Sequence, residues 1–387
     1  MHILAKLKRF VNSLCNLLAC KSNVGNKIFD TLEVMIVLGI ESSCDETAAA
    51  VVEDGYKLRS NVVASSMDLH AKYGGVVPEI AARSHIEAIN PVIQQALDDA
   101  GCTWDDIDAI AVTCGAGLGG SLLIGVLAAR TLAITKSKPL YAINHVEAHV
   151  YANFLTETSL EGYLLRESQP EFPMLALIVS GGHSQLALFR NHFDYTLLGQ
   201  TTDDAIGEAF DKVAKIVGIP YPGGPNVEKK AAEGNAHAYQ FPKAKLTNKY
   251  DFSFSGLKTA VLRAAQAAVG KDFTFPSKDL PEALSEAQKA DLAASFQRVA
   301  IETVVDKTLQ AYEEFQPKSV VIAGGVAASP ALRAHLAERL PIAISYPTPK
   351  VCTDNGAMIA TLGCFKATLG QPVADPYSLD IAPNLSM

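Results

Sequence analysis

The stretch IVLGIESSCDETAAAVVEDGYKLRSNVVA, residues 36–64, decides the fold. Three runs rich in apolar and β-branched residues, at 36–40, 47–52 and 58–64, are separated by a polar turn and by the Asp-Gly turn at 54–55. Short runs of this kind bounded by turn residues are typical of strands. Turns this tight join antiparallel neighbours. The stretch therefore predicts a three-stranded antiparallel meander.

The same pattern returns halfway along the chain, where runs at 174–180, 184–190 and 195–199 again predict three strands. Alternating helices and strands follow each meander, which indicates βαβ connections. The predicted strands outside the two meanders are 109–113, 140–143, 319–322 and one near 342. The predicted helices are 78–100 (broken or kinked near Pro91), the segment from the glycine-rich turn at 115–121 to 134, one starting at 144, 205–217, 226–234, 257–269, 286–315, 330–339 and one after 354. We predict an α/β protein of two duplicated halves with a central cleft.

The length of 387 residues suggests two or three domains. We expect an N-terminal extension at 1–34 outside the fold, a first α/β domain at 35–155 and a second at 156–387. A polar loop at 156–172 opens the second domain, and the final helix is the element that could return to the first.

Composition excludes several classes of protein. Hydrophobic residues make up 49% and charged residues 19%, and no apolar run approaches the roughly 18 residues of a membrane span. The net charge of −8 argues against a protein that coats nucleic acid. Seven cysteines, an odd number without a CxxC pair, favour a reducing compartment. We therefore predict a cytoplasmic protein without a membrane partner.

Residues 1–34 differ from the rest, because they hold five basic residues and two acidic ones and so have a net charge of +3. Since the whole chain has a net charge of −8, residues 35–387 have a net charge of −11. Apolar residues three or four apart predict a basic amphipathic helix. A mitochondrial presequence and a lipoprotein signal ending at Cys20 are alternatives, but neither pattern is complete. We favour an upstream start extension, with Met35 beginning the folded protein.

The sequence HVEAHV at 145–150 carries the sharpest chemical signal. Asn144 and Glu147 match a capping box, which places His145 and His149 one turn apart on one helix face. Such a pair can chelate a divalent metal, and one structural plus one exposed histidine is the alternative. Asp354 would complete a set of two histidines and one carboxylate, or would simply cap the following helix.

Glu147 argues against a zinc peptidase. A peptidase of the HExxH type has its glutamate directly after the first histidine. Here the glutamate is two positions on, about 200° around the helix, and faces away from the pair.

Three glycine-rich turns, at 39–47, 179–185 and 324–329, occupy related places. Paired turns can hold phosphates with backbone N–H groups, and a turn that opens a helix suits a nucleotide. One such turn alone is more often only a turn.

The motifs ESSCDET, YGGVVPEIAARSH, HVEAH, VSGGH, GEAFDKVAKIVG, YPGGP, DFSFSGLKTA, AGGVAAS and CTDNGAMIA stand in this order. From Met35 to the C-terminus the chain resembles the tRNA N6-adenosine threonylcarbamoyltransferase family. The resemblance implies the actin/hexokinase/Hsp70-like fold. It implies transfer of the threonylcarbamoyl group from threonylcarbamoyl-AMP to N6 of adenosine 37, in tRNAs reading codons that begin with A, forming t6A and releasing AMP.

The resemblance also implies residue roles. His145, His149 and Asp354 would hold one divalent metal, Fe(II) first and Zn(II) as the alternative. The substrate-binding residues would be Val179, Ser180, Gly181, Gly182, His183, Asp211, Gly224 and Ser329. Asp45 and Glu46, in the first acidic turn, are the candidate catalytic residues. They share the role of candidate proton acceptor with His183, the sequence does not rank the three, and turn capping or support of a phosphate loop is the alternative for each. The family usually has Asn where this chain has Ser329 and Pro where it has Ala116.

Partners follow from the same resemblance and from charge. Because residues 35–387 carry a net charge of −11, we expect them to bind tRNA only weakly without a partner protein. The resemblance implies an inactive paralogue and a P-loop ATPase beside the anticodon loop of tRNA and threonylcarbamoyl-AMP. An actin-like ATPase or kinase leaves the histidine pair unexplained, and a metallopeptidase leaves the phosphate turns unexplained.

Overall fold

A computed structural model describes residues 34–387, so the predicted helix of the extension lies outside the described residues. The first meander is present as predicted, with β1 (Ile36–Glu41), β2 (Glu46–Glu53) and β3 (Lys57–Ser65) antiparallel in succession. Strand β4 (Ala109–Gly115) pairs parallel to β1, and β5 (Leu140–Asn144) pairs parallel to β4. The sheet order is β5-β4-β1-β2-β3-β6, where β6 is the short strand Glu157–Thr158.

The second sheet repeats this topology. Strands β7 (Met174–Val179), β8 (Ser184–Asn191) and β9 (Asp194–Gln200) form the antiparallel meander. Strand β10 (Ser319–Ala323) pairs parallel to β7, and β11 (Ile344–Ser345) pairs parallel to β10. The order β11-β10-β7-β8-β9 matches that of the first sheet, which confirms the predicted duplication.

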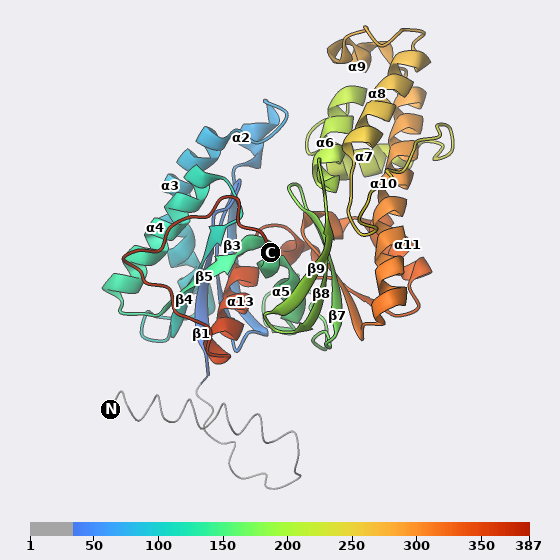
Figure 1. Ribbon diagram of the computed structural model, residues 1–387. Coiled ribbons are helices and arrows are strands. Elements are labelled where there is room, and N and C mark those ends of the chain that lie inside the picture. The colour runs from blue at the N-terminus through green and yellow to red at the C-terminus, as the bar shows by residue number, and fades with distance from the viewer. Residues whose placement is uncertain (1–33) are drawn as a thin grey trace.

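The helices form three layers around the two sheets (Figure 1). Helices α3 (Pro78–Ala100) and α4 (Gly119–Thr135) cover the outer face of the first sheet. Helices α5 (His145–Tyr151) and α13 (Gly356–Thr368) lie between the sheets and share one core with both. Residues of the other face of the second sheet share one core with α6 (Ile206–Val217), α7 (Gly223–Ala231), α8 (Ser255–Ala268), α10 (Glu286–Phe315) and α11 (Pro330–Arg339). Figure 1 shows α6, α7 and α8 beyond the end of the strands β7, β8 and β9.

Some elements differ from their prediction. Helix α3 continues through Pro91 without a break, with Pro91 on its exposed side. Strand β6 lies inside the predicted loop at 156–172 and pairs with β3. Helix α7 begins three residues earlier than predicted, and the last strand lies two residues later. Short segments that sequence periodicity did not indicate are α2 (Met67–Ala71), α9 (Leu280–Ala283), α12 (Pro349–Cys352) and 3-10 turns at Ala152–Phe154, Ser277–Asp279 and Gly325–Ala328.

After α13 the chain returns across the first sheet. Ala374 pairs with Leu140 of β5, and Ala382 donates its backbone N–H to Cys114 O at 2.7 Å. Arg130 donates to three carbonyl oxygens of residues 376–379. The tail thus covers the edge strand β5. Among the described residues, no helix is both long and apolar enough to cross a membrane.

Candidate metal and nucleotide site

Helix α5 starts where the sequence predicts. The Asn144 side chain caps it by accepting hydrogen bonds from Val146 N and Glu147 N, and its own amide donates to Ser386 O in the tail. The predicted capping box is wrong in its second half, because Glu147 makes no return bond to Asn144. Glu147 is 6% exposed and its Oε1 has no partner among the described residues. Burial consequently raises the pKa of Glu147.

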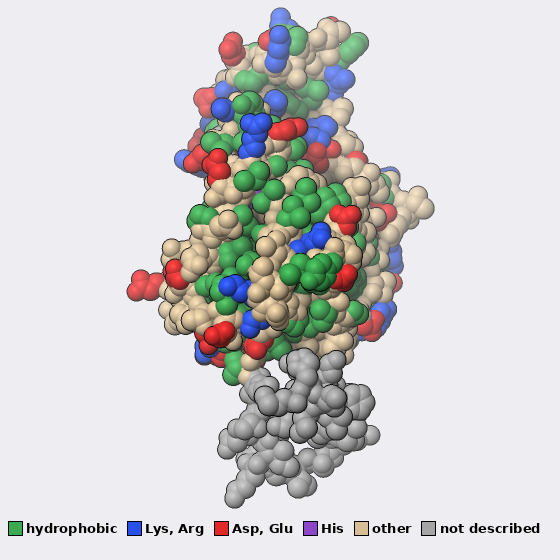
Figure 2. Space-filling view, turned by 90° about the vertical axis from the view of Figure 1, so that its left-hand side faces the viewer, with side chains coloured by type: hydrophobic (Ala, Val, Ile, Leu, Met, Phe, Trp, Pro, Cys, Tyr) green, Lys and Arg blue, Asp and Glu red, His purple; other side chains and the backbone are tan. Residues whose placement is uncertain are grey.

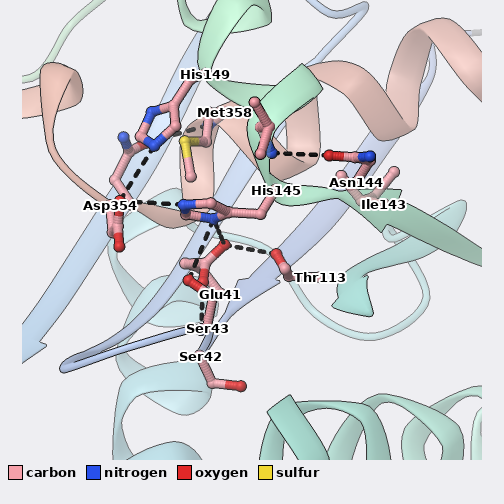
Figure 3. A network of polar contacts seen from close by, with 12 residues as sticks. Glu41, Ser42, Ser43, Thr113, Ile143, Asn144, His145, His149, Asp354 and Met358 are labelled. Carbon is pink, nitrogen blue, oxygen red and sulfur yellow. Dashed lines mark hydrogen bonds and ion pairs between the residues drawn. The ribbon is translucent and has the colours of Figure 1, made fainter. Parts of the chain in front are cut away.

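The two histidines and Asp354 meet as predicted (Figure 3). Asp354 Oδ1 lies 3.2 Å from His149 Nε2 and 3.5 Å from His145 Nε2. The candidate ligand atoms of all three residues lie within 4.8 Å of one another. Asp354 precedes α13, so this helix and α5, both in the central layer, bring the group together.

The donor set fits a metal ion. His149 is 1% exposed, and within the described part of the chain its Nδ1 has no hydrogen-bond partner while its Nε2 faces Asp354 Oδ1 at 3.2 Å. Buried polar atoms are rarely left without a partner, because an unmade bond costs about 1–3 kcal/mol. Two imidazoles and one carboxylate suit Fe(II) or Zn(II). These residues can therefore bind a metal ion.

Glu41 also contacts this group, although the sequence did not mark it as a site residue. It ends β1, is 0% exposed, and its Oε2 lies 3.1 Å from His145 Nδ1. It also accepts hydrogen bonds from Thr113 Oγ1 and Ser43 N (Figure 3). In the sequence it is the first residue of ESSCDET and directly follows an apolar strand, which was the only available signal.

Opposite charges dominate the electrostatics of this group. Burial alone would lower the pKa of His145, but Asp354 and Glu41 raise it to about 9. Burial would raise the pKa of both carboxyls, and the neighbouring histidines hold them below their ordinary values. The protein alone therefore stabilises a cation beside two carboxylates, which is the environment that a divalent metal needs.

The second glycine-rich turn, 180–183, joins β7 to β8 and closes on itself. Ser180 N donates to His183 O at 2.8 Å, and His183 N donates to Ser180 Oγ at 3.1 Å. A Cβ on Gly181 or Gly182 would meet no atom within 4 Å, so both backbones are open to an approaching group. Val179, by contrast, is fully buried in β7 and can contribute only its backbone.

Two other motifs pack against this turn. A Cβ on Gly207 would lie 2.6 Å from Ser180 O, and one on Gly324 would lie 2.4 Å from Val179 O. Both glycines are needed for this close approach, and Gly324 also has φ +89°. The motifs that carry them, GEAFDK and AGGVAAS, are thereby brought to the VSGGH turn.

His183 links this turn to the metal group. Its ring centroid lies 6.5 Å from that of His145. Burial, followed by the nearby His145 and His149, lowers the pKa of His183 to about 4. His183 is therefore neutral at pH 7 and can both donate and accept a hydrogen bond.

Asp45 lies in the turn between β1 and β2, and Glu46 is the first residue of β2. The backbone carbonyl of Asp45 accepts from Ser66 N, and Glu46 Oε1 accepts from Ser65 Oγ at 3.1 Å. Burial, with Asp354 and Asp45 nearby, raises the pKa of Glu46 to about 9. Both side chains are partly exposed, so a substrate can reach them.

Asp211 belongs to α6 in the second half. Its Oδ1 accepts from Gly223 N at 2.7 Å, which fixes the start of α7, and it makes no ion pair with a lysine in the described chain. Burial raises the pKa of Asp211, and Asp45 adds to this effect. The Gly224 backbone is open, with no atom within 4 Å of a Cβ position.

Tyr221, in the YPGGP motif, was not singled out by sequence. Burial raises the pKa of its hydroxyl, and the carboxylates of Asp45 and Asp211 raise it further. Asp45 is on the first half and Asp211 on the second, so carboxylates of both halves act on this hydroxyl. Its motif was visible in the sequence, but nothing distinguished the tyrosine from a turn residue.

Ser329 is a helix cap. Its Oγ accepts from Leu332 N at 3.2 Å at the start of α11. The hydroxyl proton is still available for donation, so one hydrogen bond to a ligand is compatible with the cap.

With this geometry established, comparisons with known proteins identify the family. A family model described as tRNA N6-adenosine threonylcarbamoyltransferase (TsaD) matches residues 57–361. A protein of that name from Thermomicrobium roseum is 49% identical over 362 residues, covering 91% of this chain and 97% of its own. One from Symbiobacterium thermophilum is 50% identical over 355 residues with the same coverage.

The chain belongs to the tRNA N6-adenosine threonylcarbamoyltransferase family. The predicted family is thus confirmed. Among solved structures, HypF from T. kodakarensis has a TM-score of 0.52 at 13% identity, covering 87% of this chain and 47% of that one. Full-length HypF in its phosphate- and nucleotide-bound form has a TM-score of 0.51 at 12% identity with the same coverage. At this identity the likeness concerns the fold, and with the duplicated sheets it confirms the predicted actin/hexokinase-like class.

Proposed function

We propose that the chain transfers the threonylcarbamoyl group from threonylcarbamoyl-AMP to N6 of adenosine 37 in tRNAs reading codons that begin with A. The product is t6A, and AMP is released. Family membership supports this proposal. The observation that carries it furthest is the buried His145, His149 and Asp354 group beside the open VSGGH turn.

The reaction forms an N6–C bond and breaks the bond between the carbonyl carbon and the phosphate oxygen. AMP departs with that electron pair, and N6 gives up one proton. Because the mixed anhydride already has a good leaving group, the protein must mainly orient the donor and stabilise charge on its oxygens. The N–H groups of Gly181 and Gly182, with Ser180 and His183, are suited to phosphate, and Val179 contributes its backbone.

The remaining substrate contacts come from the second half. Asp211 has one carboxylate oxygen beyond its bond to Gly223 N, and we assign it to a hydroxyl of the donor. The open Gly224 backbone and the Ser329 hydroxyl would lie along the nucleotide. Adenosine 37 lies in a single-stranded loop, which lowers the cost of unstacking its base.

One metal ion, Fe(II) with Zn(II) as the alternative, would be held by His145, His149 and Asp354. When bound, it supplies a positive charge that polarises a donor oxygen. Metal analysis of protein purified without oxygen tests its identity. One equivalent of iron supports Fe(II), and one equivalent of zinc with full activity overturns it.

Asp45 and Glu46 are proposed to handle the N6 proton. A group that accepts a proton must be ionised, whereas the pKa of Glu46 is about 9, so that its neutral acid prevails at pH 7 in the protein alone. We therefore assign the acceptor role to Asp45 and a hydrogen-bonding role to Glu46.

The decisive experiment is mass spectrometry of nucleosides from tRNA after depletion of the protein. We expect t6A to disappear and to return when the wild-type gene is restored but not with a His149→Ala gene. Unchanged t6A would contradict the proposal. Release of AMP from threonylcarbamoyl-AMP in a purified reaction tests the same chemistry directly.

Helix α4 offers a surface for the proposed inactive paralogue. Its outward stripe carries Leu123, Leu127 and Ile134, 41%, 45% and 38% exposed, and Ile86 of α3 is 60% exposed. Figure 2 shows apolar side chains spread over this side of the molecule. We name these four residues the α3/α4 patch. A second helical protein with an apolar face would bury it.

Leu127→Asp should abolish co-elution of the chain with its paralogue, while Leu369→Asp, at a site 51% exposed outside the patch, should leave it intact. Co-elution of both variants would contradict this assignment. The P-loop ATPase is proposed to join the same complex, and multiple-turnover modification of tRNA by the isolated chain would overturn the need for either partner.

Five free cysteines among the described residues support the cytoplasm as the compartment.

A further inference from the structure

Glu41 is a fully buried carboxylate that none of the proposed steps uses. It is 0% exposed at the end of β1, and it belongs to the same side-chain cluster as the metal ligands (Figure 3). Burying a charge is costly unless it is paired and hydrogen-bonded. Its contacts therefore indicate what keeps a carboxylate at this position.

Its two oxygens have separate partners. Oε1 accepts from Ser43 N, and Oε2 accepts from Thr113 Oγ1 and lies 3.1 Å from His145 Nδ1. The other ring nitrogen, His145 Nε2, lies 3.5 Å from Asp354 Oδ1. One edge of the imidazole thus faces Glu41, and the opposite edge faces the metal group.

We infer that Glu41 is a positioning residue for His145. An ionised carboxylate can only accept hydrogen bonds, so it selects the tautomer with the proton on Nδ1 and leaves the Nε2 lone pair for a metal. Such a carboxylate partner also fixes the ring orientation and raises the basicity of the ligand. This inference rests on the proposed metal-binding function of the group.

The histidine pair is asymmetric in this respect. His149 Nε2 also faces Asp354, at 3.2 Å, but its Nδ1 has no partner among the described residues, so His149 has no equivalent of Glu41. His145 is accordingly the anchored ligand, and His149 is held by packing and by its approach to Asp354.

Ser43 is the competing partner, because its Oγ lies 3.2 Å from the same Nδ1. A hydroxyl can donate or accept, so it fits either tautomer and cannot select one. Ser43→Ala is therefore the matched control for Glu41→Gln. Both change a contact of Nδ1, but only the second removes the charge. Thr113→Val removes a donor to Glu41 and leaves the imidazole contact in place.

The first test measures Zn(II) affinity by chelator competition on full-length variants. Glu41→Gln should bind Zn(II) about 10–100-fold more weakly, and Ser43→Ala should change affinity by less than about 3-fold. Glu41→Asp should restore part of the loss, because it keeps the carboxylate. Equal affinities of wild type and a folded Glu41→Gln would overturn the inference. Absence of stoichiometric zinc or iron in the wild type would instead overturn the metal site itself.

The second test needs no variant. Long-range ¹H–¹⁵N NMR of the zinc-loaded wild-type protein with ¹⁵N-labelled histidine reports which ring nitrogen carries hydrogen. We expect His145 to be protonated on Nδ1 and metal-bound through Nε2. Protonation on Nε2 would overturn the inference even if Glu41→Gln fails to fold.

Discussion

The turn at 41–46 between β1 and β2 and the turn at 180–183 between β7 and β8 occupy the same position in two sheets of the same topology. Their chemistry is different. The first carries the three carboxyls Glu41, Asp45 and Glu46, whereas the second carries none and presents open glycine backbones. Duplication of the fold has thus supplied two matching loops, and their side chains have diverged.

This difference divides the work of the proposed site. The carboxylate turn supports the metal group through Glu41 and offers groups for proton transfer. The glycine turn offers backbone N–H groups and a neutral His183. Helix α5, which lies between the sheets, carries the two histidines of the candidate metal site and places His145 6.5 Å from His183 by ring centroids. The central layer therefore connects the two turns.

The largest effect is expected from Asp354→Asn, which removes a carboxylate that lies close to both histidines of the candidate metal site. We expect Zn(II) affinity to fall by at least about 100-fold, because loss of a ligand costs more than loss of its hydrogen-bonding support. Transferase activity should fall with it. Elemental analysis and AMP release measure the two effects, and Asp194→Asn, at an exposed position on β9, is the control. Normal metal content in Asp354→Asn would contradict the assignment of Asp354 as a metal ligand.

The next prediction concerns Asp45. Asp45→Asn should lower kcat by about 10²–10⁴-fold while metal content stays unchanged, because general acid–base groups contribute on this scale. Glu46→Gln should cost less, since the pKa of Glu46 is already about 9 and its neutral form resembles the amide. Single-turnover kinetics with tRNA provide the measurement. A larger loss in Glu46→Gln than in Asp45→Asn would reverse the roles of the two carboxyls.

Glycine substitutions test the second turn. Gly181→Ala adds a methyl group into open space, so stability should not change while KM for threonylcarbamoyl-AMP rises. Gly207→Ala should destabilise the fold by about 1–3 kcal/mol, because its Cβ would lie 2.6 Å from Ser180 O. Chemical denaturation and steady-state kinetics separate the effects. An unchanged KM in Gly181→Ala would argue against backbone contact between this turn and the donor.

The sequence predicted the order of strands and helices because their periodicity is local. The duplicated meanders and the full length of α10 followed from it. Pro91 illustrates a limit: proline disfavours a helix interior, yet the surrounding apolar positions of α3 pack on the first sheet and outweigh that preference. The return of the tail to β5 had no periodic signal at all.

The site was predictable where residue type and spacing define it, as for His145 and His149. Glu41 was not, because its burial depends on Thr113 and His145, which are 72 and 104 positions away. The capping role of Glu147 was wrong for a similar reason. Packing of α5 between two sheets buries this side chain, so the local preference for a capping box does not decide its position.

The far ends of the two meanders extend the comparison. Gly55, between β2 and β3, lies close to Phe365 of α13, where its Cβ would be 3.1 Å from the ring. His192, between β8 and β9, stacks on the same ring at 4.3 Å between centroids, with 22° between the planes. Its Nδ1 lies 3.2 Å from Tyr151 Oη. Both meanders therefore contact α13 at this end, and the second does so through a histidine.

The smallest expected effect follows from this difference. Burial lowers the pKa of His192 from 6.5 to about 4, so between these pH values the unfolded chain binds a proton that the folded chain does not. The free energy of unfolding should therefore fall as the pH drops from 6.5 to 4. Since His192 is partly exposed, its share of the change in unfolding free energy should be on the order of 1 kcal/mol.

Chemical denaturation at pH 7.5 and pH 5 measures this change in unfolding free energy. His192→Gln should lose less stability on acidification than wild type, while His237→Gln, at an exposed position in the second half, should lose as much as wild type. The comparison between variants cancels the shared pH dependence of metal binding, so equal losses for His192→Gln and wild type would show that this contact contributes nothing to acid sensitivity.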